Sequence, residues 1–358
     1  MPLQYSDQLL KAIARIAPGT DLREGLERIL RGRTGALIVL GSDRTVQSMT
    51  SGGFVINTEF SATRLRELAK MDGAIICDRD ATTLLHAGVQ LLPDPAIETH
   101  ESGTRHRTAE RVAKQTGFPV IVVSSSMSMI SVYVDDIRYT VEHTQTLMSR
   151  ANQAIQTLES YTRRLDQVLS NLSALEIESD VTLRDVLTTL QRMEMVRRIS
   201  AEVNHYALEL GTSGRLVKLQ LEELNTPELP DPNVILRDYL PAPSEELEDA
   251  VLAGVQALST LEDKDIVDLA TIAQVINLDP HDLDMPIVPR GYRLLSGIKS
   301  VPGAIVDRLV AQFDGVQCLI AASIDDLRAV DGVGEQRAQV IRESLARMAE
   351  TTMLDGFM

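Results

Sequence analysis

The sequence predicts an α/β N-terminal domain with a mixed sheet, an all-α middle domain and a small helical C-terminal domain. Three observations indicate this fold class. Short apolar runs alternate with helix-like stretches in the first third of the chain, a heptad pattern follows, and two similar helix–turn–helix segments come last. A chain of 358 residues exceeds one ordinary core, so we place the domain borders at 1–144, 145–289 and 290–358.

Apolar runs predict the strands of the first domain. Each run is short and almost wholly apolar, as expected of a buried strand. Helices separate the runs, and one of them has Ser61 as a candidate N-cap. This alternation is typical of a layered α/β domain. The strands are expected at 35–41, 73–78 and 118–124, the helices at 61–70 and 104–116, and a hairpin over 130–142 that turns at Asp135 and Asp136.

A long helix with a heptad seam is expected over 147–175. Its apolar residues alternate between spacings of four and three, the repeat of a helix that buries one stripe against a partner helix. The partner is either a helix of the same chain or a helix of a second subunit. Further helices are expected at 182–210, at 214–224 and from Ser244, with a break at the proline-rich segment 225–233.

The charge of the chain is unevenly distributed. The net charge is −16, and the middle segment 145–289 alone holds 11 Lys and Arg against 25 Asp and Glu. A protein that binds nucleic acid through its overall charge would be basic. Any contact with nucleic acid is therefore expected to be local, and the acidic middle segment is expected to present a solvated face.

The sequence also bears on compartment and redox state. No apolar run approaches the roughly 20 residues of a membrane span, and charged residues interrupt the first 20 positions, which are unlike a signal peptide. We therefore expect a cytoplasmic protein without membrane contact. Cys77 and Cys318 are far apart in apolar surroundings, and we expect both to be unpaired core residues.

The stretch "SGTRHRTAERVAKQTG" at 102–117 reads as a helix with Thr104 as N-cap and Gly117 at its end. Its first turn holds Arg105, His106 and Arg107, although the N-terminus of a helix favours acidic residues. A bound anion reverses this preference, because backbone N–H groups and guanidiniums then act on one ligand.

The ligand expected at this helix is a phosphate group, with hydroxyls of Thr104 and Thr108 as further donors. The alternative is that the two arginines pair with Glu101 or Glu110 on the surface. In "MDGAIICD", Asp72 lies at the entrance to a buried strand, where a carboxylate near polyphosphate can hold a divalent metal or accept a hydroxyl proton.

Together these motifs resemble the diadenylate cyclase family, and over nearly the whole chain its DNA integrity scanning members. The resemblance rests on Gly35-Ala36-Leu37-Ile38, the Ser51-Gly52-Gly53 loop, Asp72-Gly73-Ala74 and the run from Gly103 to Thr108. It implies the synthesis of cyclic di-AMP from two ATP with release of two pyrophosphates. It also implies two opposed active faces, which the family assembles as a homo-octamer.

The resemblance assigns roles to individual residues. Asp72 would ligate Mg²⁺ or Mn²⁺ and help the ribose 3′-hydroxyl attack the facing ATP. Gly73 and Leu91 would line the nucleotide pocket, and the phosphates would be held by Thr104, Arg105, His106, Arg107, Thr108 and Ser124. The family also carries an arginine shortly after this serine. The run Ser124-Ser-Ser-Met-Ser-Met contains none, so another group must take that place.

The C-terminal segments resemble the helix-hairpin-helix module. In "DGVGEQRAQVI", Gly332 and Gly334 flank Val333, and such glycines let backbone N–H groups approach a DNA phosphate without reading bases. Ala338 and Ile341 would bury the following helix. The first segment, "GIKSVPGAIVDRL", lacks the paired glycines, and Lys299 could assist it. The expected partner is branched DNA such as a Holliday junction.

Two other functions remain compatible with these residues. One is a branched-DNA-binding repair factor without catalytic activity, whose first domain senses ATP. The other is a structural scaffold built on the long heptad helix. The alternative for the C-terminal hairpins is that they pack against protein and not against DNA.

Overall fold

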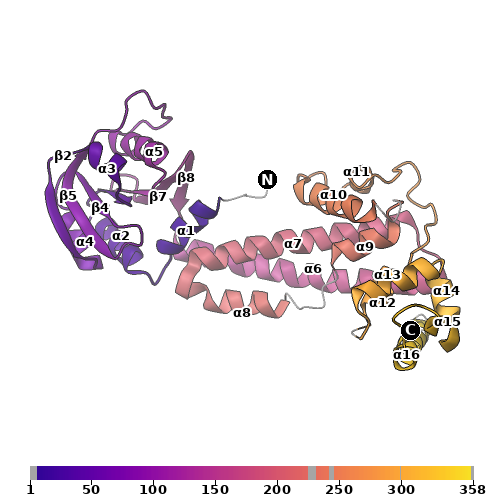
Figure 1. Ribbon diagram of the computed structural model, residues 1–358. Coiled ribbons are helices and arrows are strands. Elements are labelled where there is room, and N and C mark those ends of the chain that lie inside the picture. The colour runs from indigo at the N-terminus through magenta and orange to yellow at the C-terminus, as the bar shows by residue number, and fades with distance from the viewer. Residues whose placement is uncertain (1–5, 225–230, 242–245, 299, 356–358) are drawn as a thin grey trace. The chain divides into compact units, whose positions relative to one another are not determined.

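The computed structural model describes residues 6–224, 231–241, 246–298 and 300–355 (Figure 1). The chain forms two compact units. One contains residues up to 155 together with 202–221, and the other contains 156–201 together with the chain from 222 onward. Within the described ranges, no helix has both the length and the apolar character that crossing a membrane requires.

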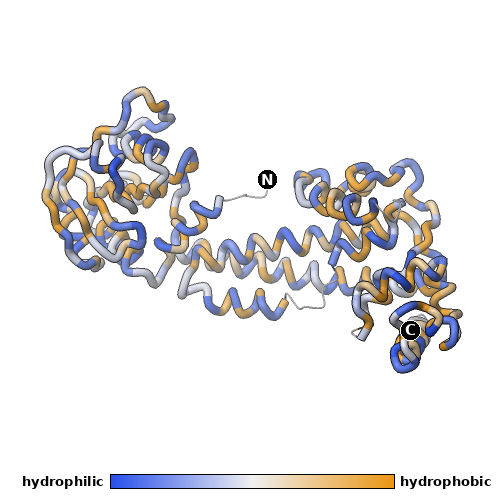
Figure 2. The backbone as a smooth tube through the Cα atoms, in the orientation of Figure 1, coloured by the Kyte–Doolittle hydropathy of each residue, from blue (hydrophilic) through white to orange (hydrophobic). Residues whose placement is uncertain are grey.

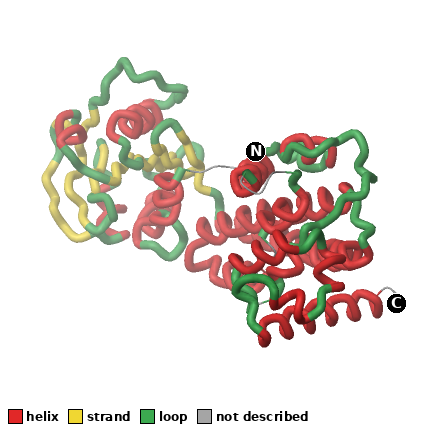
Figure 3. Tube along the Cα trace, turned by 45° about the vertical axis from the view of Figure 1, so that its right-hand side comes forward, coloured by secondary structure: helices red, strands yellow, loops and turns green. Residues whose placement is uncertain are grey.

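The first unit is built on a mixed eight-stranded sheet, and Figure 3 shows strands in this part of the chain. The order is β2-β5-β4-β1-β6-β7-β8, with β3 also paired to β5. Strands β1 and β4 are parallel and their other neighbours are antiparallel, which confirms the predicted mixed sheet. The bounds are β1 (Ala36–Leu40), β2 (Thr50–Ser51), β3 (Phe54–Glu59), β4 (Ala74–Cys77), β5 (Thr83–Leu91), β6 (Val120–Ser124), β7 (Met129–Val134) and β8 (Ile137–Val141).

Helices cover both faces of this sheet. In β1, Ile38 and Leu40 point into one core and Leu37 and Val39 into the other, since side chains alternate along a strand. Burial on both faces explains why the strand reads as a continuous apolar run. Helices α1 (Asp7–Arg15), α2 (Asp21–Arg31) and α4 (Ala62–Leu68) pack on the first core, and α3 (Arg44–Ser48) and α5 (Thr104–Thr116) pack on the second.

The strands, helices and hairpin expected in this region are confirmed, including the N-cap at Ser61, whose side chain accepts a hydrogen bond from a backbone N–H of α4. Gly117 ends α5 in the left-handed conformation, as predicted. The N-cap assigned to Thr104 is wrong. Gly103 is the N-cap of α5 and Thr104 is its first helical residue, so no side chain caps this helix.

Two long helices carry the heptad seam. In Figures 1 and 3, α6 (Thr144–Glu178) and α7 (Leu183–Leu210) lie side by side, and Figure 2 shows apolar residues recurring along both. Leu158, Leu165 and Leu172 of the seam are at most 1% exposed within a single chain. The seam therefore packs inside its own chain, one of the two partners predicted. A short 3₁₀ turn (Gly211–Gly214) and α8 (Arg215–Leu224) follow.

The rest of the chain is helical. It comprises α9 (Pro232–Tyr239), α10 (Leu247–Thr260), α11 (Leu269–Val275), α12 (Tyr292–Ser296), α13 (Gly303–Gln312), α14 (Val316–Ala321), α15 (Ile324–Arg328) and α16 (Glu335–Asp355). Helix α9 lies partly within the segment expected to be a break. The helix start predicted at Ser244 falls outside the described residues, and α10 is seen from Leu247.

The pairs α12–α13 and α15–α16 repeat one local structure. In the first turn the N–H of Val301 donates to the carbonyl of Ile298 at 2.9 Å, and in the second the N–H of Val333 donates to Val330 at 3.1 Å. All four side chains are buried. The similarity predicted between the two segments is thus present in the backbone, and Ala338 and Ile341 bury α16 as expected, both at 0% exposure.

The two cysteines differ. Cys77 is fully buried in β4, as predicted, and burial raises the pKa of its thiol to about 12. The prediction of a core position is wrong for Cys318, which is exposed on α14. Its apolar neighbours Val316 and Leu319 take the buried side of that short helix instead.

Candidate functional site

One edge of the sheet gathers the residues predicted to bind ATP. Because β1 and β4 are parallel, their N-terminal ends share this edge. Ile38 pairs with Ile75, so three residues earlier on each strand Gly35 and Asp72 lie at the same level. The two sequence motifs, separated by 36 positions, are therefore neighbours in the fold.

The antiparallel strands bring two further residues to the same edge. Val89 of β5 pairs with Ala74 at the start of β4, which places Leu91 beyond it. Strand β6 runs antiparallel to β1 and ends at Ser124. Neighbouring strands are about 4.8 Å apart, so the ends of β4 and β6 are separated by about 10 Å across β1. Phosphates of one nucleotide can span this width.

Asp72 lies in the turn before β4 and is exposed. Its Oδ1 accepts a hydrogen bond from the N–H of Gly73 at 3.1 Å. Gly73 has a φ of +108°, and a Cβ there would lie 2.7 Å from the carbonyl carbon of Gly88 in β5, so only glycine fits. Sequence reasoning missed Gly88, although a lone glycine inside a strand often marks such a close backbone approach.

The N-terminus of α5 adds positive charge to the edge. The guanidinium of Arg105 lies over Gly35, because a Cβ at Gly35 would be 2.0 Å from its Nη1 and 3.3 Å from the carbonyl oxygen of Val123. Thr104 is exposed and Thr108 is half-buried in the same turn. The first turn contains no acidic residue.

The two carboxylates that could neutralise these arginines are bound elsewhere, and neither is exposed. Glu101 pairs with Arg138 at 2.9 Å. Glu110 pairs with Lys114 at 3.0 Å and also accepts a hydrogen bond from the Thr99 hydroxyl. Burial opposes ionisation of Glu110, but the hydrogen bonds from Thr99 and Lys114 outweigh it and lower the pKa of that carboxyl.

Neither Arg105 nor Arg107 forms an ion pair within the described part of the chain, and both side chains are exposed. The alternative in which the arginines pair with Glu101 or Glu110 is therefore wrong. Two cations that remain unpaired beside exposed backbone N–H groups form an anion-binding arrangement.

His106, between these arginines, is in a different environment. Its ring is 7% exposed, and Nδ1 lies 2.7 Å from the hydroxyl of Tyr133 in β7. Burial lowers the pKa of His106, and of the two nearby charges Glu101 opposes this effect and Arg138 adds to it. This environment favours the neutral form of the imidazole.

Leu91 and Ser124 lie at the edge, but both residues are largely buried. The Leu91 side chain is 8% exposed and belongs to the core beneath α5, so its backbone is the part available to a ligand. The Ser124 hydroxyl accepts a hydrogen bond from the N–H of Met127 at 3.4 Å and lies 3.3 Å from the Ser126 hydroxyl. These contacts lie within the turn that follows β6, the segment in which the sequence has no arginine.

A divalent metal fits this edge only in company with a substrate. In the part of the chain that the structure describes, no three His, Cys, Asp or Glu side chains cluster as a metal site. Asp72 supplies a single exposed carboxylate. Mg²⁺ is commonly held by one or two carboxylates together with substrate phosphates and water, so the donor set present here is compatible with it.

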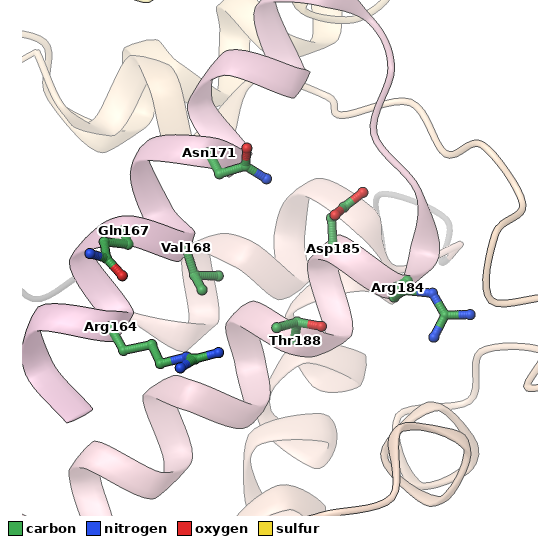
Figure 4. A pocket seen from close by; sticks show the side chains of 7 residues that line it. All are labelled: Arg164, Gln167, Val168, Asn171, Arg184, Asp185 and Thr188. Atoms are coloured by element: carbon green, nitrogen blue, oxygen red, sulfur yellow. The ribbon is translucent and has the colours of Figure 1, made fainter. Parts of the chain in front are cut away.

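A separate cavity of about 300 Å³ lies between α6 and α7 (Figure 4). Figure 4 shows Arg164 of α6 and Arg184 of α7 among the residues that line it, and Arg184 pairs with Asp284 at 2.8 Å. Its lining is made of helical residues alone and contains no residue of the sheet edge: Arg164, Gln167, Val168, Asn171, Arg184, Asp185 and Thr188.

The mixed sheet, the glycine-lined edge and the unpaired arginines at a helix N-terminus define an α/β nucleotide-binding domain. Residues 23–137 match the family model described as DisA bacterial checkpoint controller nucleotide-binding (DAC), and residues 141–283 match the DisA bacterial checkpoint controller linker region. The chain belongs to the DisA family and is a diadenylate cyclase. This excludes the readings as a non-catalytic repair factor and as a scaffold alone.

Relatives match the chain over its whole length. It is 56% identical over 360 residues to the DNA integrity scanning protein DisA of Kineococcus radiotolerans, which covers 100% of both chains. It is 53% identical over 355 residues to that of Streptomyces coelicolor, covering 98% of this chain and 95% of the relative. The crystal structure of DacA from Staphylococcus aureus is similar over 37% of this chain and 88% of its own, with 22% identity and a TM-score of 0.30.

Proposed function

We propose that the chain condenses two ATP into cyclic di-AMP and two pyrophosphates at the edge formed by β1, β4, β5 and β6. The observation that supports this most directly is the pairing of opposite chemistries at one edge. Unpaired guanidiniums of Arg105 and Arg107 lie at the N-terminus of α5, and the exposed carboxylate of Asp72 lies level with Gly35 on the neighbouring strand.

The reaction needs two such edges facing each other. The 3′-hydroxyl oxygen of each ATP attacks the α-phosphorus of the other, a phosphorus–oxygen bond forms, and the bond to the bridging oxygen breaks as pyrophosphate leaves. One edge provides the hydrogen-bond donors for the phosphates of one ATP. We therefore propose that two copies of the chain meet at this face within a homo-octamer.

Each side chain has a separate part in the proposed reaction. Arg105 and Arg107 bind the phosphates together with the hydroxyls of Thr104 and Thr108, and Asp72 accepts the 3′-hydroxyl proton. A Mg²⁺ or Mn²⁺ ion held by Asp72 and the phosphates would neutralise charge on the reacting phosphate. Gly73, Leu91 and Ser124 shape the pocket mainly through their backbone.

The test is to incubate the purified full-length protein with ATP and either metal, and to analyse the product by mass. Cyclic di-AMP is expected, and Asp72→Asn should lower its rate of formation about 10²-fold or more. Asp80→Asn is the matched control, since Asp80 is an exposed carboxylate that pairs with Arg15. Near-normal turnover of Asp72→Asn would remove the assigned role.

We further propose that the C-terminal hairpins form a helix-hairpin-helix module that binds the backbone of branched DNA. Gly332 has a φ of +86°, which favours glycine, and its carbonyl accepts a hydrogen bond from Arg337. At Gly334 no atom lies within 4 Å of the position of a Cβ, so this turn is open to a ligand. Lys299, predicted to assist the first hairpin, lies outside the described residues.

A buried polar network supports coupling between this module and the long helices. The carboxylate of Asp238 in α9 accepts hydrogen bonds from three consecutive backbone N–H groups at the start of α12, at 2.6 to 2.7 Å. Arg293 of α12 pairs with Glu176 of α6, which also accepts a hydrogen bond from Tyr239. We propose that DNA binding acts on the cyclase through this junction, and junction DNA titrated into the ATP reaction tests it.

A further inference from the structure

A series of hydrogen bonds, buried at its His106 end, runs from the first turn of α5 into the sheet. His106 Nδ1 lies 2.7 Å from the Tyr133 hydroxyl, and that hydroxyl donates to Glu101 Oε1 at 2.9 Å. Arg138 of β8 fixes the same carboxylate with contacts of 2.9 and 3.2 Å. Tyr133 is 1% exposed and its contact with His106 is buried, so water does not compete for that contact.

The positions of the protons in this series of hydrogen bonds follow from the donors and acceptors. Glu101 is ion-paired and acts as an acceptor, so the single hydroxyl proton of Tyr133 points toward Glu101. Burial and this hydrogen bond raise the pKa of Tyr133, which keeps its proton. The Tyr133 oxygen must then accept from His106, and His106 carries its proton on Nδ1.

The second ring nitrogen of His106 is left without a proton. A neutral imidazole that is protonated on Nδ1 has a lone pair on Nε2, which only accepts hydrogen bonds. Nε2 has no hydrogen-bond partner within the described part of the chain. The ring edge that carries it faces the helix start, since Cδ2 lies 3.4 Å from the position of a Cβ at Gly103.

We propose that Tyr133 is a positioning residue of the cyclase, which holds His106 in the Nδ1–H tautomer so that Nε2 accepts a hydrogen bond from ATP. This rests on the proposed function of the edge. A phosphate oxygen is itself an acceptor, so His106 is not a third phosphate ligand. The group it recognises is an O–H or N–H of the nucleoside, either a ribose hydroxyl or the adenine amino group.

The tautomer is measured directly by solid-state NMR of the full-length protein labelled with ¹⁵N-histidine. The chain has 6 histidines, and the spectrum of His106→Asn identifies the signals of His106. The expected signals are a protonated Nδ1 and an unprotonated Nε2 in the wild type, and Nε2–H in Tyr133→Phe. A wild-type His106 protonated on Nε2 or on both nitrogens would overturn the proposal, whether or not the protein makes cyclic di-AMP.

Kinetics separate positioning from a purely structural role. Tyr133→Phe should lower kcat about 10-fold with a smaller change in the KM for ATP, because the hydroxyl that holds His106 is lost together with its bond to Glu101. Tyr139→Phe, on the adjacent strand β8, is the control and should leave kcat unchanged. His106→Asn keeps a donor at the position of Nδ1 but lacks Nε2, so it should be as inactive as His106→Ala. Full activity of His106→Asn would contradict the proposal.

Substrate analogues identify the donor. The loss caused by His106→Asn is compared for ATP, 2′-deoxy-ATP and inosine triphosphate, which lacks the amino group. With the analogue that lacks the O–H or N–H group bonded to Nε2, the rate of His106→Asn should equal that of the wild type. A loss that persists with both analogues assigns the bond to the 3′-hydroxyl. Equal rates of wild type and His106→Asn with all three nucleotides would contradict recognition through Nε2.

Discussion

Replacing Gly35 by alanine should disable the site without unfolding the domain. A Cβ at this position would lie 2.0 Å from Nη1 and 3.0 Å from Cζ of Arg105. The φ of Gly35 is outside the left-handed region, so alanine adopts the same backbone. The two closest atoms belong to the far end of a flexible side chain, and the Val123 carbonyl oxygen at 3.3 Å needs to shift by only a few tenths of an ångström, so the guanidinium moves away from its position at the edge.

The expected magnitude follows from the bonds that Arg105 would lose. A hydrogen bond to a charged group contributes about 1.5–3 kcal/mol. At 1.36 kcal/mol for each factor of ten, this predicts a roughly 10- to 100-fold drop in kcat/KM for cyclic di-AMP synthesis. The melting temperature of the protein without ATP should hardly change, because the displaced group is exposed.

A double-mutant cycle tests whether the effect passes through Arg105. Gly35→Ala, Arg105→Ala and the double variant are compared in kcat/KM and melting temperature. If the methyl group acts by displacing the guanidinium, Gly35→Ala should have little further effect once Arg105 is alanine. Equal losses in both backgrounds, or full activity of Gly35→Ala, would refute the reasoning.

Four more predictions follow from the same contacts. Replacing Arg105 and Arg107 together with alanine should weaken ATP binding, measured by calorimetry, with the apo melting temperature nearly unchanged. Gly73→Ala should lower the free energy of unfolding by more than about 1 kcal/mol in urea titrations, since φ is +108° and backbone lies 2.7 Å away. Gly334→Glu should weaken junction DNA binding at fixed salt yet keep basal cyclic di-AMP synthesis. Because burial lowers the pKa of His106 below 6.5, the unfolded chain binds a proton first as pH falls, so stability should drop below about pH 6.5 and drop less in His106→Asn.

Local pattern predicted strands β1, β4 and β6, the β7–β8 hairpin and helices α4 to α8, but not helices α1 to α3 or strands β2 and β3. Strand β1 is apolar throughout because both of its faces are buried, and its run is visible in the sequence. Strand β5 was not predicted, because His86 and Gly88 interrupt its apolar run and several of its residues are only half-buried. The domain borders at 144 and 289 stay a prediction, since α6 and α7 each contribute to both compact units.

The sequence by itself determined which chemistry the site contains: two arginines at a helix start, a carboxylate before a strand, and glycines beside both. The tertiary structure decided which of these groups is free. Only the fold shows that Arg138 of β8 pairs with Glu101, whereas Lys114 pairs with Glu110 at the local i,i+4 spacing of α5. Only the fold shows that the His106 side chain contacts the buried Tyr133 hydroxyl. The physical reason is that local spacing fixes helix periodicity and i,i+4 pairs, whereas a pair such as Glu101–Arg138 depends on which side chains distant elements bring within about 4 Å.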